Sequence, residues 1–156
     1  MSADLAYERP LLVTVGSDNT ARVWNYLTMK CEMNHSFRSD EPLSVAINAN
    51  GFQVLVAFKD RVRLYNVLSN KLKFSKEAVL KNTRCLKFSR GCQYWAAASG
   101  INVVIYESKS FHQLQIFQAH YTHTIHTIHT IHTIHNIHTI HTIHTIHTIH
   151  TIYRDT

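Results

Sequence analysis

The feature that most constrains this chain is an internal repeat with a period of 41 residues. Tyr65 follows Trp24 by 41 residues, and Tyr106 follows Tyr65 by the same interval. A fixed period of this size indicates that similar structural units stack on one another along the chain. The segments that share the register are 20–25, 61–66 and 102–107.

Each period contains four short runs with the alternating pattern of β-strands, separated by turn residues such as Asn50-Gly51 and Arg90-Gly91. Four strands in about 40 to 45 residues make one blade of a β-propeller. We therefore predict an all-β fold, a partial propeller of about three four-stranded blades at 4–40, 41–81 and 82–120. The first blade is expected to keep only a remnant of its inner strand near Asp4, which gives about eleven strands.

Closed propellers have about four to eight blades, so the remaining blades are expected from a full-length chain. The aromatic of each period should fill the wedge between successive blades. The middle blade should be the most ordered, and the isolated chain is expected to be prone to aggregation because its outer blade faces stay uncovered.

The end of the first period resembles a WD40 repeat. Gly16-Ser17-Asp18 precedes Trp24-Asn25, and Ala119-His120 is similar to the pair that opens the next repeat. Later periods depart from this pattern, because Lys59 and Gly100 stand where Asp18 stands in the first. The structural signature of the blades is predicted to be Asp18, Trp24, Tyr65, Tyr106 and His120.

Residues 9–120 resemble the cilia- and flagella-associated WD-repeat proteins, most clearly at 9–26, 54–68 and 84–91. The resemblance implies a long axonemal scaffold that helps to position inner dynein arms on doublet microtubules. It also implies protein partners, such as an axonemal scaffold, dynein arm or tubulin component. The expected location is the cytoplasm and cytoskeleton, specifically the axoneme of a cilium or flagellum.

A basic stretch is the candidate surface for binding these partners. The formal charge is +6, and an acidic protein surface would complement it. Alternatively, these residues form a solvated face whose lysines protect an edge strand. Nucleic acid is a weaker alternative, because the pattern contains no recognition helix. The candidate residues are Lys71, Lys73, Lys76, Arg84 and Lys87.

The sequence contains no motif of a known catalytic or cofactor site, such as a phosphate-binding glycine loop or a metalloprotease HExxH. We therefore expect a non-enzymatic chain without a cofactor. No apolar run is long enough for a membrane helix, so no membrane partner is expected. The odd set of Cys31, Cys85 and Cys92 does not suggest a disulfide framework.

Residues 121–156 form a separate low-complexity tail in which His-Thr-Ile repeats from His123 to Ile152. A period of three gives neither a helix nor a strand an apolar face, so the tail is expected to be irregular and not a fourth blade. Imidazoles bind zinc, nickel and copper, so the tail has incidental metal candidates, although no dedicated metal site is predicted. These candidates begin with His123, His126, His129 and His132.

The interpretation that follows is a protein-interaction scaffold of the axoneme. Two alternatives stay open: a general cytosolic WD40 adaptor without a role in cilia, and a propeller fragment with a metal-binding histidine tail.

Overall fold

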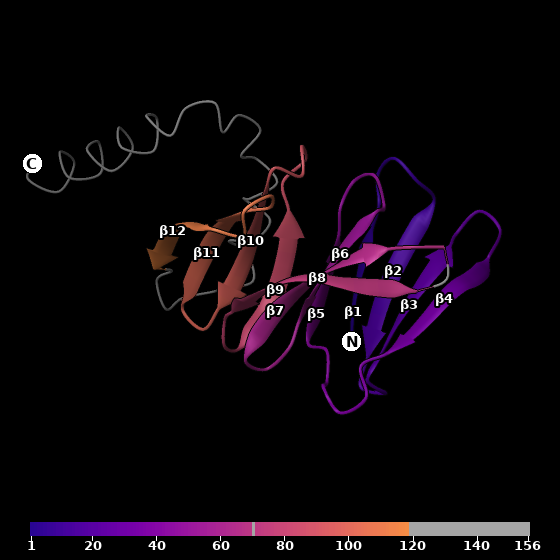
Figure 1. Cartoon of the computed structure of the whole chain (residues 1–156), viewed down its shortest axis with the longest axis horizontal. Coiled ribbons are helices and arrows are strands. Elements are labelled where there is room, and N and C mark those ends of the chain that lie inside the picture. Colours follow the sequence, from indigo (N-terminus) through magenta and orange to yellow (C-terminus); the bar gives the residue numbers. More distant parts are fainter. Residues whose placement is uncertain (70, 119–156) are drawn as a thin grey trace, which may run out of the picture. The chain divides into compact units, whose positions relative to one another are not determined.

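A computed structural model describes residues 1–69 and 71–118 of the chain. These residues form twelve β-strands in three four-stranded antiparallel sheets (Figure 1). The predicted all-β fold with blade-like units is confirmed. The histidine tail and His120 lie outside the described residues, so the division of the chain at residue 120 stays a prediction.

Each sheet is a meander in which neighbouring strands follow one another along the chain. Sheet 1 contains β1 (Ser2–Leu5), β2 (Leu11–Gly16), β3 (Thr20–Asn25) and β4 (Lys30–Ser36). Sheet 2 contains β5 (Ser44–Ile47), β6 (Gln53–Ala57), β7 (Arg61–Val67) and β8 (Leu72–Val79). Sheet 3 contains β9 (Thr83–Phe88), β10 (Tyr94–Ser99), β11 (Asn102–Glu107) and β12 (Gln113–Gln118).

The first inner strand is more complete than the sequence suggested. β1 is not a remnant, since all four of its residues pair with β2, from Ser2 opposite Val15 to Leu5 opposite Leu12. The side chains of Ser2 and Asp4 also accept hydrogen bonds from the backbone of β5. These polar contacts explain why a short strand without a marked apolar alternation is nevertheless ordered.

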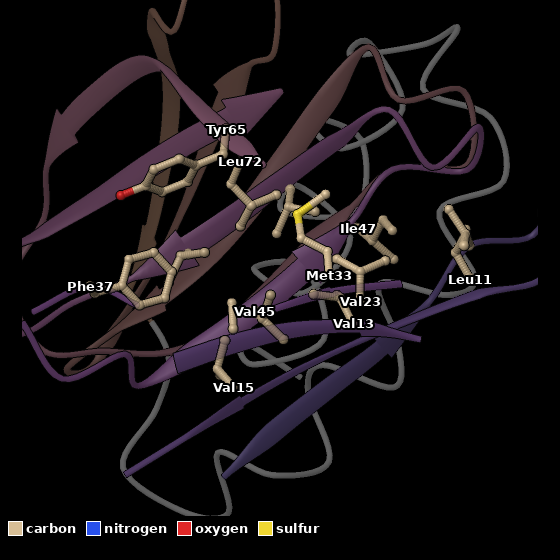
Figure 2. Close-up of a cluster of buried hydrophobic side chains, with 14 of the residues drawn as sticks. Leu11, Val13, Val15, Val23, Met33, Phe37, Val45, Ile47, Tyr65 and Leu72 are labelled. Atoms are coloured by element: carbon tan, nitrogen blue, oxygen red, sulfur yellow. The ribbon is translucent and has the colours of Figure 1, made fainter. Parts of the chain in front are cut away.

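One hydrophobic core joins sheets 1 and 2. Side chains of a strand alternate between its two faces, so Val13, Val15 and Val23 point together to one side of sheet 1. They meet Val45 and Val56 from sheet 2. Figure 2 shows this cluster, in which Met33 and Leu72 bring the outer strands β4 and β8 into the same core.

A second core joins sheets 2 and 3 through the opposite face of sheet 2. It contains Ala46, Leu55 and Leu64 from sheet 2, packed against Leu86 and Trp95 of sheet 3. Both faces of the strands β5, β6 and β7 are therefore covered, and all of β5 is buried, whereas most of β8 is exposed. This is why the strands of the middle period contain continuous apolar runs instead of a simple alternation.

The period aromatic coincides with a local irregularity in every sheet. The pairing with the outermost strand shifts register immediately before Trp24, before Tyr65 and before Tyr106. A bulge bends the strand pair and redirects the side chains beside it. The repeat in sequence thus reflects a repeated backbone geometry as well as a repeated side chain.

Gly51 should tolerate substitution less well than Gly100. Both residues have positive φ, 74° and 59°, where alanine is strained. At Gly51 an added Cβ would also lie 2.9 Å from Leu11 Cδ1, whereas nothing lies within 4 Å at Gly100. We expect Gly51→Ala to lower the free energy of unfolding by about 2 kcal/mol and Gly100→Ala by about 1 kcal/mol, measured by urea denaturation. Equal losses would show that Leu11 of sheet 1 can move away from a Cβ at position 51 without any cost in stability.

Candidate functional site

Two of the three period aromatics lie at the junctions between sheets. Tyr65 belongs to the core of sheets 1 and 2, and Tyr106 belongs to the core of sheets 2 and 3. Each of them has only 5% of its surface exposed. Both side chains therefore face the sheet that precedes their own along the chain.

The expectation that Trp24 also packs between successive blades is wrong for the described residues. Trp24 is half-buried and belongs to neither core, whereas its neighbour Val23 points into the core with sheet 2. Alternation places the two side chains on opposite faces of sheet 1. By analogy with Tyr65 and Tyr106, Trp24 lies on the face where a preceding blade would pack. Leu5 lies on the same face and is 48% exposed.

The signature residues Asp18 and Trp24 form side-chain hydrogen bonds in sheet 1, and among the described sheets only sheet 1 has this arrangement. Trp24 Nε1 donates a hydrogen bond to Thr14 Oγ1 at 2.9 Å. In the next turn Asp18 accepts hydrogen bonds from the Thr20 hydroxyl at 2.8 Å and from Arg22 Nη2 at 2.6 Å. The bond from Thr20, together with the charge of Arg22, lowers the pKa of Asp18.

Sheets 2 and 3 lack this arrangement because the required groups are absent. The position of Thr14, opposite Arg22, corresponds to Val56 opposite Arg63 and to Ala97 opposite Val104. Neither Val56 nor Ala97 has a hydroxyl group. In these two sheets the period aromatics, Tyr65 and Tyr106, are therefore held in place by apolar packing.

An aromatic group surrounds the ring of Tyr65 at the first junction. Phe37 lies 5.7 Å and His35 lies 5.9 Å from its centroid, both from the end of sheet 1. Arg63 borders the group, and its Nε donates to Glu77 at 2.7 Å while its Nη1 lies 3.3 Å from Asp40. Burial lowers the pKa of His35, because it deprives the charged form of the ring of stabilising hydration.

The five basic residues of the predicted partner surface do not form one continuous surface. Lys71 is exposed just before β8 and Lys73 is exposed on it, at the outer edge of sheet 2. Arg84 and Lys87 lie on β9, which packs against β5 at the inner edge. Three strand spacings separate β8 from β5, on the order of 14 Å.

Two of these lysines are also engaged within the chain. Lys76 donates a hydrogen bond to the carbonyl of Lys109, which links sheet 2 to a turn of sheet 3. Lys87 is half-buried and forms an ion pair. The exposed basic side chains in this set are therefore Lys71, Lys73 and Arg84.

Asp4 connects the inner strands of all three sheets, a feature that sequence reasoning missed. Its Oδ2 accepts a hydrogen bond from Ile47 N of β5 at 3.0 Å, and its Oδ1 lies 2.5 Å from Lys87 Nζ of β9. Burial opposes the charge of Lys87, but the hydrogen bond and the negative charge of Asp4 outweigh it and raise the pKa of Lys87. The two residues are 83 positions apart, so no local pattern could have indicated the pair.

A mixed-charge cleft lies where the turn β6–β7 meets the segments between sheets. Its lining includes Asp40, Lys59 and Asp60. Both carboxylates already have partners, Arg63 for Asp40 and Arg61 for Asp60.

Among residues 1–69 and 71–118, no cluster of His, Cys, Asp or Glu could hold a metal ion, and no helix could span a membrane. The histidines proposed as incidental ligands lie outside this part of the chain.

Comparison with known proteins identifies relatives of this chain. Cilia- and flagella-associated protein 57 A of Tetrahymena thermophila is 33% identical over 104 residues, which is 67% of this chain. The mouse (Mus musculus) cilia- and flagella-associated protein 57 is 27% identical over 117 residues, 75% of this chain. The chain is homologous to part of cilia- and flagella-associated protein 57. The expected resemblance to the cilia- and flagella-associated WD-repeat proteins is confirmed.

A second Tetrahymena relative, cilia- and flagella-associated protein 57 C, is 29% identical over 124 residues. All three relatives have ciliary and flagellar names, which supports the expected association with a cilium or flagellum. The matched region is 8% of the first relative's length and 9% of each of the other two. No protein-family model matches the chain.

Proposed function

We propose that this chain is a segment of a propeller scaffold that binds other proteins in the axoneme and has no catalytic role. The observation that supports this proposal best is that hydrophobic cores on the two faces of sheet 2 join it to both other sheets. The homology to part of cilia- and flagella-associated protein 57 supports the axonemal setting. Sheets that pack face to face in series form a rigid framework, and they leave turns and outer edges free for binding.

Further blades of a longer protein would complete the propeller in this proposal. Trp24 and Leu5 present an apolar face on sheet 1 that corresponds to the faces of sheets 2 and 3 covered by a preceding sheet. The relatives are also much longer than the matched region. Positioning of inner dynein arms on doublet microtubules, as the family resemblance implies, is the specific role that we assign to the complete scaffold.

Fractionation of ciliated cells tests this proposal. The endogenous protein is tagged, and isolated cilia are extracted with detergent to separate the membrane and soluble fractions from the axoneme. We expect the protein in the axonemal pellet, and we expect reduced inner-arm dynein in axonemes from cells that lack the gene. A protein confined to the cell body would favour a general cytosolic adaptor instead.

A further inference from the structure

The two ends of sheets 1 and 2 differ in the side chains that their turns expose. The turns β1–β2, β3–β4, β5–β6 and β7–β8 lie at one end of these meanders, because strand direction alternates. Apart from Tyr7 in the turn β1–β2, these turns expose five large apolar side chains to solvent, and together we call these five the turn-end surface. They are Tyr26 (43% exposed), Leu27 (74%), Met29 (84%), Phe52 (47%) and Leu68 (41%).

Backbone and side-chain contacts link these turns into a continuous surface. Tyr26 N donates to the Pro10 carbonyl at 3.0 Å, which joins the turn β3–β4 to the turn β1–β2. The guanidinium carbon of Arg9 lies 4.0 Å from the centroid of the Phe52 ring, which joins the turns β1–β2 and β5–β6. Val67 N donates to the Phe52 carbonyl at 2.8 Å beside Leu68. The surface therefore spans both sheets.

Positive charge borders the turn-end surface. Arg9, Lys30 and Lys71 are exposed in or next to its turns, and no salt bridge among the described residues involves them. Glu8 is the one carboxylate within the described residues of these four turns. The opposite end of the two sheets differs, since its connections contain Asp18, Asp40, Glu41 and Asp60.

Solvent-exposed apolar side chains that are grouped in this way mark protein-binding surfaces. Exposed aromatic and methionine side chains, together with arginine, are the residues enriched at such interfaces. A cationic border favours a partner of opposite charge, because complementary potentials speed association and fix the orientation. The exposed apolar side chains and the cationic border together favour a ligand that has both apolar and acidic side chains.

We propose that the turn-end surface docks an acidic protein segment that also carries apolar side chains. The apolar side chains of the segment cover Leu27, Met29 and Phe52, while its carboxylates face Lys30 and Lys71. This inference rests on the proposed scaffold function and names the chemistry of the partner at one surface of that scaffold.

Fluorescence anisotropy with the full chain tests the proposal. The probe is a fluorescein-labelled peptide of about 15 residues in which glutamate alternates with leucine and phenylalanine. We expect saturable binding, weakened at least about tenfold in Leu27→Ser/Met29→Ser and in Lys30→Glu/Lys71→Glu. The matched control is Ile101→Ser/Lys59→Glu, which changes one exposed apolar and one exposed basic side chain at the opposite end of the sheets and should leave the dissociation constant unchanged.

Two further probes determine which property is recognised. A peptide with lysine in place of glutamate and a peptide with serine in place of leucine and phenylalanine should each bind at least about tenfold more weakly than the first. Absence of binding by the acidic apolar peptide, equal weakening in the control variant, or tighter binding of a labelled single-stranded oligonucleotide would each overturn the proposal. If the peptide fails to bind while the tagged protein stays in the axoneme, the docking surface is wrong and the scaffold function stands.

Discussion

Replacing Trp95 by alanine is expected to lower the free energy of unfolding by about 4 kcal/mol, and to separate sheet 3 from sheet 2. The Trp95 side chain is 1% exposed. Its ring stacks on Tyr106 with centroids 4.3 Å apart and planes 6° apart, and Phe111 lies 5.1 Å away. Truncation removes the centre of the second core and leaves a cavity. Urea denaturation followed by far-ultraviolet circular dichroism measures the loss.

The matched control is Trp95→Phe. The buried Nε1 of Trp95 has no hydrogen-bond partner among the described residues, so removing it deprives no acceptor of its donor. Phenylalanine keeps an aromatic face against Tyr106 and leaves a smaller cavity than alanine does, so the expected loss is about 2 kcal/mol, roughly half that of Trp95→Ala. A small loss for both variants would show that sheets 2 and 3 do not share the core described above.

Replacing Asp4 by alanine is expected to destabilise the chain by about 3 kcal/mol, because it leaves the buried backbone N–H of Ile47 and the half-buried ammonium of Lys87 without a partner. The Asp4 side chain is 11% exposed, and it accepts from both Ile47 N and Lys87 Nζ. Asp4→Asn keeps an acceptor for Ile47 and should cost less. The measurement is again the free energy of unfolding in urea.

A double-mutant cycle separates the ion pair from the backbone contact. Asp4→Ala/Lys87→Met should be more stable than the sum of the single losses predicts, with a coupling energy of about 1 to 2 kcal/mol. Asp60→Ala is the control, since Asp60 belongs to an ion pair at 2.8 Å but its side chain is 56% exposed. Its expected loss is below about 0.5 kcal/mol. Additive effects at Asp4 and Lys87 would mean that the pair does not connect the sheets.

The 41-residue repeat was sufficient to predict the number of sheets and the buried positions of Tyr65 and Tyr106. Apolar alternation is a local property of the sequence, and packing between successive sheets follows from the repeat. Trp24 was placed wrongly because its covering sheet would have to come before β1. A pattern shows which face of a strand is apolar, but not whether a neighbour covers that face.

The polar contacts were much less predictable. Lys71, Lys76 and Lys87 are similar in the sequence, yet one is exposed, one binds a carbonyl and one is paired with Asp4. Their roles depend on which strand edge each occupies and on contacts with another sheet. The turn-end surface was also missed, since its members become neighbours only through turns that are up to about 40 residues apart along the chain.

Hydrogen exchange of the full chain, followed by mass spectrometry at neutral pH, tests the central claim that three blades pack in series through two shared cores. Amide protection reports the free energy of local opening. We expect the strongest protection in β5, β6 and β7, which the two cores cover on both faces, and weaker protection in β1, β4 and β12. Uniform protection from Leu11 through Gln118 and on into the histidine tail, or protection that is weakest in β5 and β6, would contradict the account.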